Sequence, residues 1–268
     1  GESAGAHAVA TLLAVPEAEG LFHQAISQSP ASGMVSTPEV AAEVADRFAE
    51  RLHVSRGDAA ARLMTAKPAE LVHAMDAVMR HSLTNMLGAA AVGPTCGDDY
   101  LPLDPFEAMR KGTAHKVPLI VGTNADEGRL FTRFLKLLPT TEHALARLLS
   151  HTSPEVRERI LAAYPHYPHP KACVEFGGDM IFSTAAWQIA EAHAKLAPTY
   201  VYRYDYAPRT LHWTGFGATH ATELLAVFGI YRSRVGAVLT AGVDQRTAVK
   251  VSHLVQTRWN EFARTGVP

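Results

Sequence analysis

The chain has few cysteines, almost no net charge and no long apolar run. Cys96 and Cys173 are its only cysteines, too few for a disulfide framework, so reduced thiols are expected, with a single bridge as the alternative. The formal net charge of −1 over 268 residues favours neither nucleic acid nor acidic lipid as a partner. No stretch approaches ~18 consecutive apolar residues, so no membrane span is predicted.

Internal repeats, low-complexity tracts and long linkers are also missing, which argues against an array of small domains. The apolar content of 47% is that of an ordinary globular protein. Helical patterns alternate with short strand candidates, and this alternation predicts an α/β architecture with a largely parallel sheet. The sequence is compatible with both a cytoplasmic and a secreted protein.

Three segments read as strands. Residues 21–29 contain a short buried strand with its approach, and residues 117–122 form a continuous apolar run that ends in a turn. Residues 199–206 alternate strictly and place four tyrosines on one face. Such alternation is typical of a strand near the edge of a sheet, where one face is partly wet.

Several helices have recognisable starts. Residues 6–14 are small, apolar and compatible with a helix. Pro38, Pro68 and Pro154 each stand where a first helical residue is expected. A last helix is predicted from a cap at about Asp244 to a stop at Gly266.

The chain opens on Gly1-Glu2-Ser3-Ala4-Gly5, a G-x-S-x-G pentapeptide. In serine hydrolases this motif places the nucleophile on a sharp turn from strand to helix, and glycines allow close backbone approach there. A strand should precede such a turn, and the sequence contains none before it. We therefore expect the chain to be the later part of a longer domain.

Two further segments complete a catalytic order. The apolar run at 117–121 leads into Gly122–Gly128 (GTNADEG), at the end of a strand where α/β sheets present functional side chains. A histidine, His220, lies later in the small-residue loop GATHATEL. The order serine, acid, histidine is that of α/β-hydrolases. Asp126 is the main rival of Glu127 for the acid.

Taken together, these segments resemble the C-terminal half of type-B carboxylesterases, the family of cholinesterases and bacterial p-nitrobenzyl esterases. The matching segments, in order, are GESAG, LFHQAISQS, GTNADEG, YVYRYDYAP, GATHATEL and WNEFARTG. The resemblance implies a partial α/β-hydrolase fold: residues 1–268 would form the C-terminal part of a single domain whose N-terminal half is missing. That half would be a partner of this chain.

The resemblance also implies roles for single residues. Ser3 would be the nucleophile, His220 the general base and Glu127 the acid of the triad. The Ala4 N–H would be one oxyanion donor, and two more would come from an HGG-type loop that the sequence does not contain. The type-B family needs no metal or organic cofactor.

Two residues are candidates for contacts to the triad. Ser29 would hydrogen-bond the acid or simply cap the end of a strand, and Glu2 would join a polar network beside the nucleophile. Glu223, three residues after His220, is interpreted as a structural partner rather than the triad acid. His7 is expected to point into packing.

Other polar residues receive ordinary interpretations. His151, His166 and His169 lie near a proline-rich stretch without metal-binding spacing, so a solvated loop is expected. Asp98 and Asp99 are expected in a polar turn.

The sequence thus predicts a serine hydrolase of small carboxylic esters that works through an acyl-enzyme. Two alternatives stay open. One is a catalytically silent, cholinesterase-like binding module, and the other is a fragment that is inactive without its N-terminal half.

Overall fold

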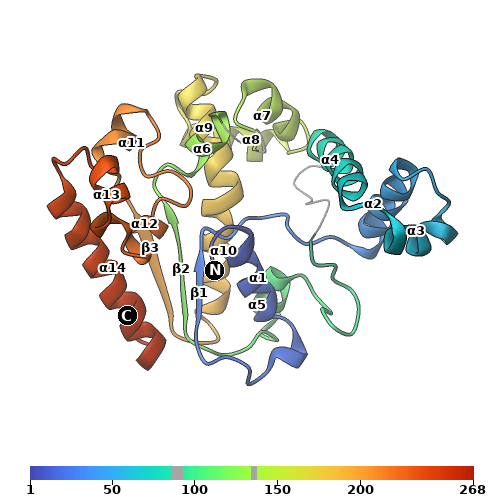
Figure 1. Ribbon diagram of the computed structural model, residues 1–268, viewed down its shortest axis with the longest axis horizontal. Helices are drawn as coiled ribbons and strands as arrows, with labels where there is room; N and C mark the ends of the chain where they lie inside the picture. Colours follow the sequence, from blue (N-terminus) through green and yellow to red (C-terminus); the bar gives the residue numbers. More distant parts are fainter. Residues whose placement is uncertain (86–92, 134–137) are drawn as a thin grey trace.

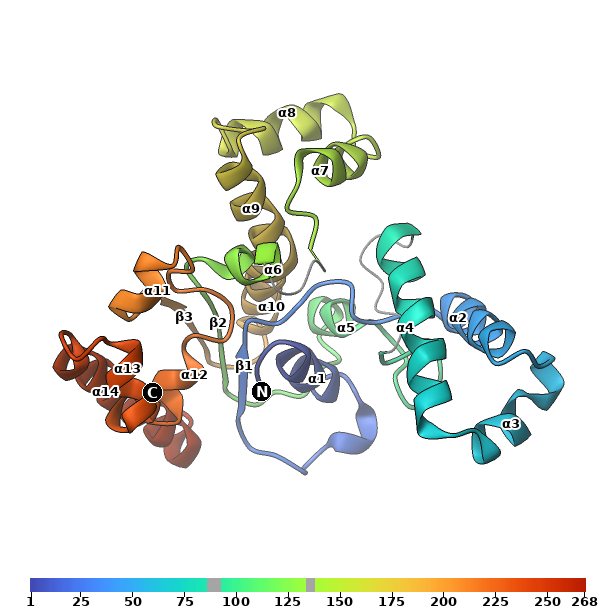
Figure 2. The same ribbon diagram turned by 45° about the horizontal axis from the view of Figure 1, so that its top comes forward.

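The computed structural model describes residues 1–85, 93–133 and 138–268. A small sheet lies between helices, and Figure 1 shows α11 to α14 on one side of it and α1, α5 and α10 on the other. Helices α2 to α4 form a group away from the sheet, and α7 to α9 form a second group (Figures 1 and 2).

The sheet consists of β1 (Ala25–Gln28), β2 (Leu119–Asn124) and β3 (Thr199–Tyr204), in that order and all parallel. Glu2 adds an isolated parallel bridge to Gln28. The carboxyl ends of the strands therefore meet at one edge, which is where functional groups are expected in a parallel sheet.

The helices alternate with these strands along the chain, and α1, α5, α10 and α11 to α14 flank the sheet. In chain order, the helices are α1 (Ala4–Leu12), α2 (Pro38–Arg51), α3 (Ala59–Thr65), α4 (Pro68–Asn85), α5 (Pro105–Lys111), α6 (Leu130–Arg133), α7 (Glu142–Leu149), α8 (Pro154–Ala163), α9 (Pro170–Gly178), α10 (Thr184–His193), α11 (Arg209–Trp213), α12 (Leu224–Val227), α13 (Arg234–Leu239) and α14 (Gln245–Thr265). Short 3₁₀ turns are η1 (Pro16–Ala18), η2 (Arg56–Asp58), η3 (Glu127–Arg129) and η5 (Ile230–Arg232), whereas η4 (Asp179–Ser183) is a π-helical segment.

The predicted strands are confirmed, with shifted limits. All of β2 is buried, as expected for a central parallel strand, and it continues to Asn124 because its end pairs with β3. On β3, Val201 and Arg203 are exposed while Tyr204 is buried. This alternation agrees with the predicted position at the edge of the sheet.

The core lies on both faces of the sheet. On one face, Leu119 and Val121 pack with Ala10 of α1 and Ile189 of α10. On the other face, the rings of Tyr202 and Trp259 meet edge to face with centroids 5.1 Å apart, which fixes α14 against β3.

The helix starts follow the predicted signals with one exception. Thr37 caps α2 by accepting a hydrogen bond from the Val40 N–H at 3.4 Å, and Gly266 ends α14 with φ of 76°. Asp244 occupies the cap position of α14, but its side chain makes no cap hydrogen bond. The expected cap is wrong in this respect, because Asp244 Oδ2 instead accepts from the Tyr206 hydroxyl at 3.2 Å.

The structure also tests the predictions about the cysteines and about membrane spans. Cys96 and Cys173 are both free thiols, so the alternative of a bridge is wrong. Within the described ranges, no helix is long and apolar enough to cross a membrane.

Candidate active site

The turn that carries Ser3 is strained and held in place by backbone hydrogen bonds. Ser3 has φ of 57° and ψ of −122°, a region that non-glycine residues rarely occupy. Its N–H donates to the Gln28 carbonyl at 2.9 Å, and the Gln28 N–H donates to the Gly1 carbonyl at 2.9 Å. The strand β1 therefore fixes the turn, and α1 begins at the next residue.

The two glycines of the pentapeptide differ in whether a side chain would fit at their positions. A Cβ on Gly1 would collide with the carbonyl oxygen of Gly5, so only glycine fits at position 1. At Gly5, an added Cβ would meet nothing within 4 Å in the part of the chain that the structure describes. The expectation of close backbone approach is confirmed for Gly1 and is wrong for Gly5 within the described residues.

Ser3, His220 and Glu127 form one series of hydrogen bonds, although Ser3 and His220 lie 217 positions apart in the sequence. Ser3 Oγ lies 2.8 Å from His220 Nε2. On the other side of the ring, His220 Nδ1 lies 2.6 Å from Glu127 Oε2. His220 and Glu127 are buried, with exposed fractions of 7% and 3%. This sequence of hydrogen-bonded groups allows a proton to pass from the serine to the ring, while the carboxylate fixes the tautomer of the ring.

The second oxygen of Glu127 is fully occupied. Glu127 Oε1 accepts a hydrogen bond from Ser29 Oγ at 2.5 Å and from the Asn124 N–H at 2.7 Å. Ser29 therefore makes the expected contact to the acid. Of the two acids in this loop, Asp126 lies outside this cluster, because its carboxylate pairs with Arg129 at 2.7 Å and accepts from the Ala218 N–H at 3.0 Å.

The histidine loop is tied to the acid loop through the two residues that precede His220. The Asp126 N–H donates to the Ala218 carbonyl at 2.9 Å, and the Leu130 N–H donates to Thr219 Oγ1 at 2.8 Å. Gly217 precedes these contacts with φ of 61°, and a Cβ there would collide with Asp126 Oδ2. These contacts set the position of the ring from the backbone.

Two phenylalanines that sequence reasoning did not identify pack around His220. The ring centroids of Phe182 and Phe131 lie 4.4 Å and 5.2 Å from that of His220. Phe182 belongs to η4 and Phe131 to α6, and both are buried. Nothing in the local sequence marks them, because the contact is made across separate elements.

Glu2 reaches the same ring nitrogen as Ser3. Glu2 Oε1 lies 3.1 Å from His220 Nε2 but has no hydrogen-bond partner among the described residues, since Ser3 Oγ already pairs with that nitrogen. Burial raises the pKa of Glu2 to about 7, with Glu223 and Glu127 adding to the rise and His220 opposing it.

The carboxylates around His220 determine its charge. Burial acts to lower the pKa of the imidazole, but the hydrogen bond and charge of Glu127, with the charges of Glu2 and Glu223, outweigh it and the net pKa is raised. The site therefore favours an imidazolium once a proton arrives.

The remaining candidates make their hydrogen bonds to groups other than His220. His7 is buried, and its Nδ1 contacts the Ala31 carbonyl at 3.0 Å, so it points into packing as predicted. Glu223 contacts Gln28 and Asn124 rather than His220. His169 caps α9 by accepting from the Lys171 N–H at 3.3 Å.

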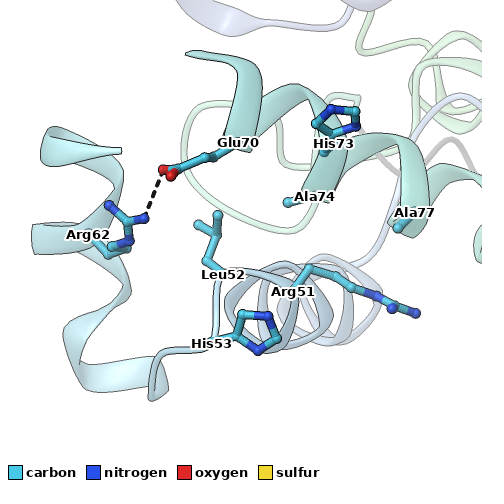
Figure 3. Close-up of a pocket in the computed structure, with 8 residues that line it drawn as sticks. All are labelled: Arg51, Leu52, His53, Arg62, Glu70, His73, Ala74 and Ala77. Carbon is cyan, nitrogen blue, oxygen red and sulfur yellow. Dashed lines mark hydrogen bonds and ion pairs between the residues drawn. The ribbon is translucent and has the colours of Figure 1, made fainter. Parts of the chain in front are cut away.

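Among the described residues, no group of histidine, cysteine and acidic side chains could hold a metal ion. A surface pocket of about 440 Å³ lies among α2, α3 and α4 (Figure 3). It is lined by Arg51, His53, Arg62 and His73, among others, and contains none of the triad candidates. The side chains drawn in Figure 3 do not converge on one point, and Arg62 is paired with Glu70 at 2.8 Å.

The chain is similar to known proteins along its whole length. The family model of the carboxylesterase family matches residues 1–268. The chain is 32% identical to para-nitrobenzyl esterase of Bacillus subtilis (strain 168), a match that covers all of this chain and 53% of that protein. A fumonisin B1 esterase from Sphingopyxis macrogoltabida is 30% identical, over all of this chain and 48% of that protein.

Solved structures give the same result. A p-nitrobenzyl esterase superposes with a TM-score of 0.80 at 30% identity, covering 100% of this chain and 53% of that one. A carboxylesterase from Geobacillus stearothermophilus gives 0.75 at 30% identity, covering 100% and 54%. The chain therefore has part of the α/β-hydrolase fold and spans about half the length of the relatives it matches. By the family model and these matches, the chain belongs to the carboxylesterase family.

Proposed function

We propose that this chain carries the catalytic residues of a serine carboxylic-ester hydrolase. The observation that supports this best is the hydrogen-bonded series Ser3 Oγ, His220 Nε2, His220 Nδ1 and Glu127 Oε2, with contacts of 2.8 Å and 2.6 Å. The named esterases among its relatives support the same class of reaction.

The reaction proceeds in two acyl transfers. Ser3 Oγ attacks the ester carbonyl while His220 Nε2 takes its proton, and the carbonyl oxygen becomes an oxyanion. The oxyanion collapses, the bond to the alcohol oxygen breaks, and the leaving alcohol takes the proton from Nε2. Water then attacks the acyl-serine with the same proton transfers, which releases the acid and restores Ser3.

Each partner of His220 has a separate task. Glu127 keeps a proton on Nδ1, so that Nε2 is free to accept from Ser3, and it stabilises the imidazolium that follows. Ser29 and the Asn124 N–H hold Glu127 in place through its other oxygen. Glu2 Oε1 lies 3.1 Å from Nε2, close enough to accept a hydrogen bond from the imidazolium while Ser3 Oγ is bonded to the substrate.

The Ala4 N–H is the proposed oxyanion donor in this chain. It stands at the first position of α1, where no earlier carbonyl of the helix accepts its hydrogen bond. A donor in such a place is commonly worth about 3 kcal/mol toward the transition state.

We also propose that the complete catalytic domain contains a further segment, which would supply the remaining oxyanion donors and part of the ester pocket. The relatives are about twice as long as this chain, which spans 53% of the Bacillus subtilis esterase. Ala4, Ala8 and Leu12 form an exposed, small and apolar face of α1, suited to packing against such a segment.

The test is labelling with a fluorophosphonate probe, read by intact mass and peptide mapping in the complete protein. We expect one adduct, on Ser3, which is lost in Ser3→Ala and kept in Ser150→Ala, an exposed serine outside the site.

A folded protein that takes up no probe would contradict the proposal and favour a silent binding module. An adduct on another serine would contradict the assignment of the nucleophile.

A further inference from the structure

Trp259, on α14, contacts the side chain of Gln28 at the end of β1. The indole Nε1–H donates to Gln28 Oε1 at 3.2 Å. Because an indole nitrogen only donates, the Gln28 atom that faces it must be the carbonyl oxygen. The amide NH₂ of Gln28 is thereby turned toward Glu223 Oε1, to which it donates at 3.0 Å.

A second amide is oriented in the same manner from the opposite side. Asn124 Nδ2 lies 3.1 Å from the Thr219 carbonyl, which only accepts, so this atom must be the NH₂ group. The same NH₂ group donates to Glu223 Oε2 at 2.5 Å. Both amides therefore present N–H groups to Glu223, and neither can rotate without losing its other partner.

Glu223 is 1% exposed and receives one N–H donor on each oxygen. A carboxylate accepts on both oxygens, whereas a neutral carboxylic acid would need an acceptor for its proton. The arrangement of donors thus matches the anion.

Burial and neighbouring acids oppose ionisation of Glu223. Burial is the main cause that raises its pKa, and Glu127 adds to the rise, while the hydrogen bonds from Asn124 and Gln28 lower it. Glu2 and His220 interact with Glu223 through their charges. The charge of Glu223 raises the pKa of the hydroxyl groups of Tyr202, Tyr204 and Tyr231, although burial is the main cause of those rises.

We propose that Trp259 and Gln28 are positioning residues that hold Glu223 as a carboxylate anion beside the Ser3–His220–Glu127 cluster. The proposal rests on the proposed function, because the anion acts by stabilising the imidazolium of His220. The C-terminal helix α14 thereby acts on the general base without touching it.

The sign of the effect follows from electrostatics. A negative Glu223 favours protonated His220, so loss of that charge lowers the pKa of His220. The acid limb of the pH–rate profile, where His220 must lose its proton to act as a base, then moves to lower pH.

The test measures the fluorophosphonate labelling rate of Ser3 against pH in the complete protein. Trp259→Phe keeps an aromatic ring but loses the N–H donor together with part of the indole's volume, whereas Gln28→Met keeps length and removes the amide. Glu223→Gln removes the charge itself, and Trp213→Phe, at an exposed tryptophan, is the matched control.

We expect Trp259→Phe and Gln28→Met to move the acid limb down by about half a pH unit, and Glu223→Gln by at least as much. Trp259→Phe added to Glu223→Gln should give no further shift, because the two changes act through one charge. Trp213→Phe should leave the limb in place. The proposal would be overturned if Trp259→Phe left the acid limb in place, or if the shifts of the two single variants added up in the double variant. A lower melting temperature without these shifts would indicate an effect on stability alone.

A measurement that does not depend on catalysis tests the hydrogen-bond network of Trp259 and Gln28 separately from the proposed esterase activity. The three tryptophans of residues 1–268 each give one indole N–H signal by NMR, and Trp187 and Trp213 are exposed. We expect the Trp259 signal to exchange slowly with D₂O in the parent protein and rapidly in Gln28→Met. Equal exchange in both would contradict the network, whereas a protected Trp259 in a protein that takes up no probe would contradict only the esterase.

Discussion

At Ser3, backbone strain and function occur at the same residue. A positive φ at a non-glycine residue costs on the order of 1–3 kcal/mol and persists only where the surroundings impose it. The hydrogen bonds between the turn and Gln28 impose it here, and the exposed start of α1 follows directly. The strain aims Ser3 Oγ at His220 rather than into the helix.

Ser29 offers a matched test of support for the triad acid. Ser29→Ala removes the 2.5 Å donor to Glu127 but leaves the Asn124 N–H in place. We expect kcat/KM for an ester to fall about tenfold, the effect of losing roughly 1.4 kcal/mol of transition-state stabilisation.

The control for this change is Ser27→Ala. Ser27 is also buried on β1, but its hydroxyl donates to the Ala6 carbonyl at 3.0 Å and not to the triad. An equal loss of kcat/KM in both variants, at equal loss of stability, would show that Ser29 contributes only to folding.

The raised pKa of Glu2 implies that the stability of the protein depends on pH. Its pKa rises from 4.5 to about 7 in the folded state, so the folded protein keeps a proton that the unfolded chain releases between these values. Stability contributed by Glu2 is thus present below pH 4.5 and is lost as pH rises toward 7. The slope reaches at most about 1.4 kcal/mol per pH unit.

Glu2→Gln should remove that slope from the unfolding free energy measured in urea between pH 4.5 and 7. The raised pKa of His220 acts in the same direction near the upper end, since its contribution is lost as pH rises through the folded pKa. A parent protein whose slope equals that of Glu2→Gln would contradict the burial argument.

Among the elements, the π-helical segment η4 interrupts an otherwise continuous helix from α9 to α10. Such segments often occur at functional sites because they displace side chains from the regular helical pattern. Here η4 carries Phe182, whose ring lies 4.4 Å from that of His220. At the end of α9, a Cβ on Gly178 would come within 2.6 Å of the Gly128 nitrogen, so glycine lets this helix approach the acid loop.

The histidine loop depends on a glycine that can be tested. Gly217→Ala forces a Cβ against Asp126 Oδ2 in a backbone with φ of 61°. We expect a loss of about 2–4 kcal/mol in the free energy of unfolding, together with a lower labelling rate of Ser3.

Gly242→Ala is the control for backbone conformation alone. Gly242 has φ of 68°, but an added Cβ would meet nothing within 4 Å among the described residues. This variant should lose about 1 kcal/mol and keep its labelling rate. Equal losses of stability and labelling rate in both variants would show that the collision of the added Cβ with Asp126 does not destabilise the protein further.

The described part of the molecule exposes large apolar side chains at the end of α1 and in the segment that leads into β1. Leu12 and Leu21 have exposed fractions of 44% and 77%, and within the described residues β1 pairs along its length with β2 only. Exposed strand edges and apolar faces favour association.

The segment 1–268 produced alone should therefore associate in size-exclusion chromatography and bind a hydrophobic dye. If the proposed further segment covers these side chains, the protein that contains it should be less associated and should label at Ser3 at least about tenfold faster. A monomeric segment with the full labelling rate would contradict the proposed requirement for a further segment.

Local patterns predicted much of this protein because they depend on neighbours in the chain. The strand at 117–122, the helix starts at Pro38 and Pro154 and the stop at Gly266 follow from periodicity, proline geometry and glycine conformation. The candidates Ser3, Glu127 and His220 were identified from motifs in order, and their side chains do meet. Asp244 shows the limit, since a distant tyrosine takes the hydrogen bond expected at the cap.

The sequence by itself determined the family resemblance, the alternation of strands and helices and the identity of the triad candidates. Only the tertiary structure decided which groups surround them: Phe182 and Phe131 on the ring of His220, and Trp259 acting on Glu223 through Gln28. These contacts join residues up to 231 positions apart. Spacing along the chain does not encode them, because they arise from the packing of β1, α14 and η4 around one edge of the sheet.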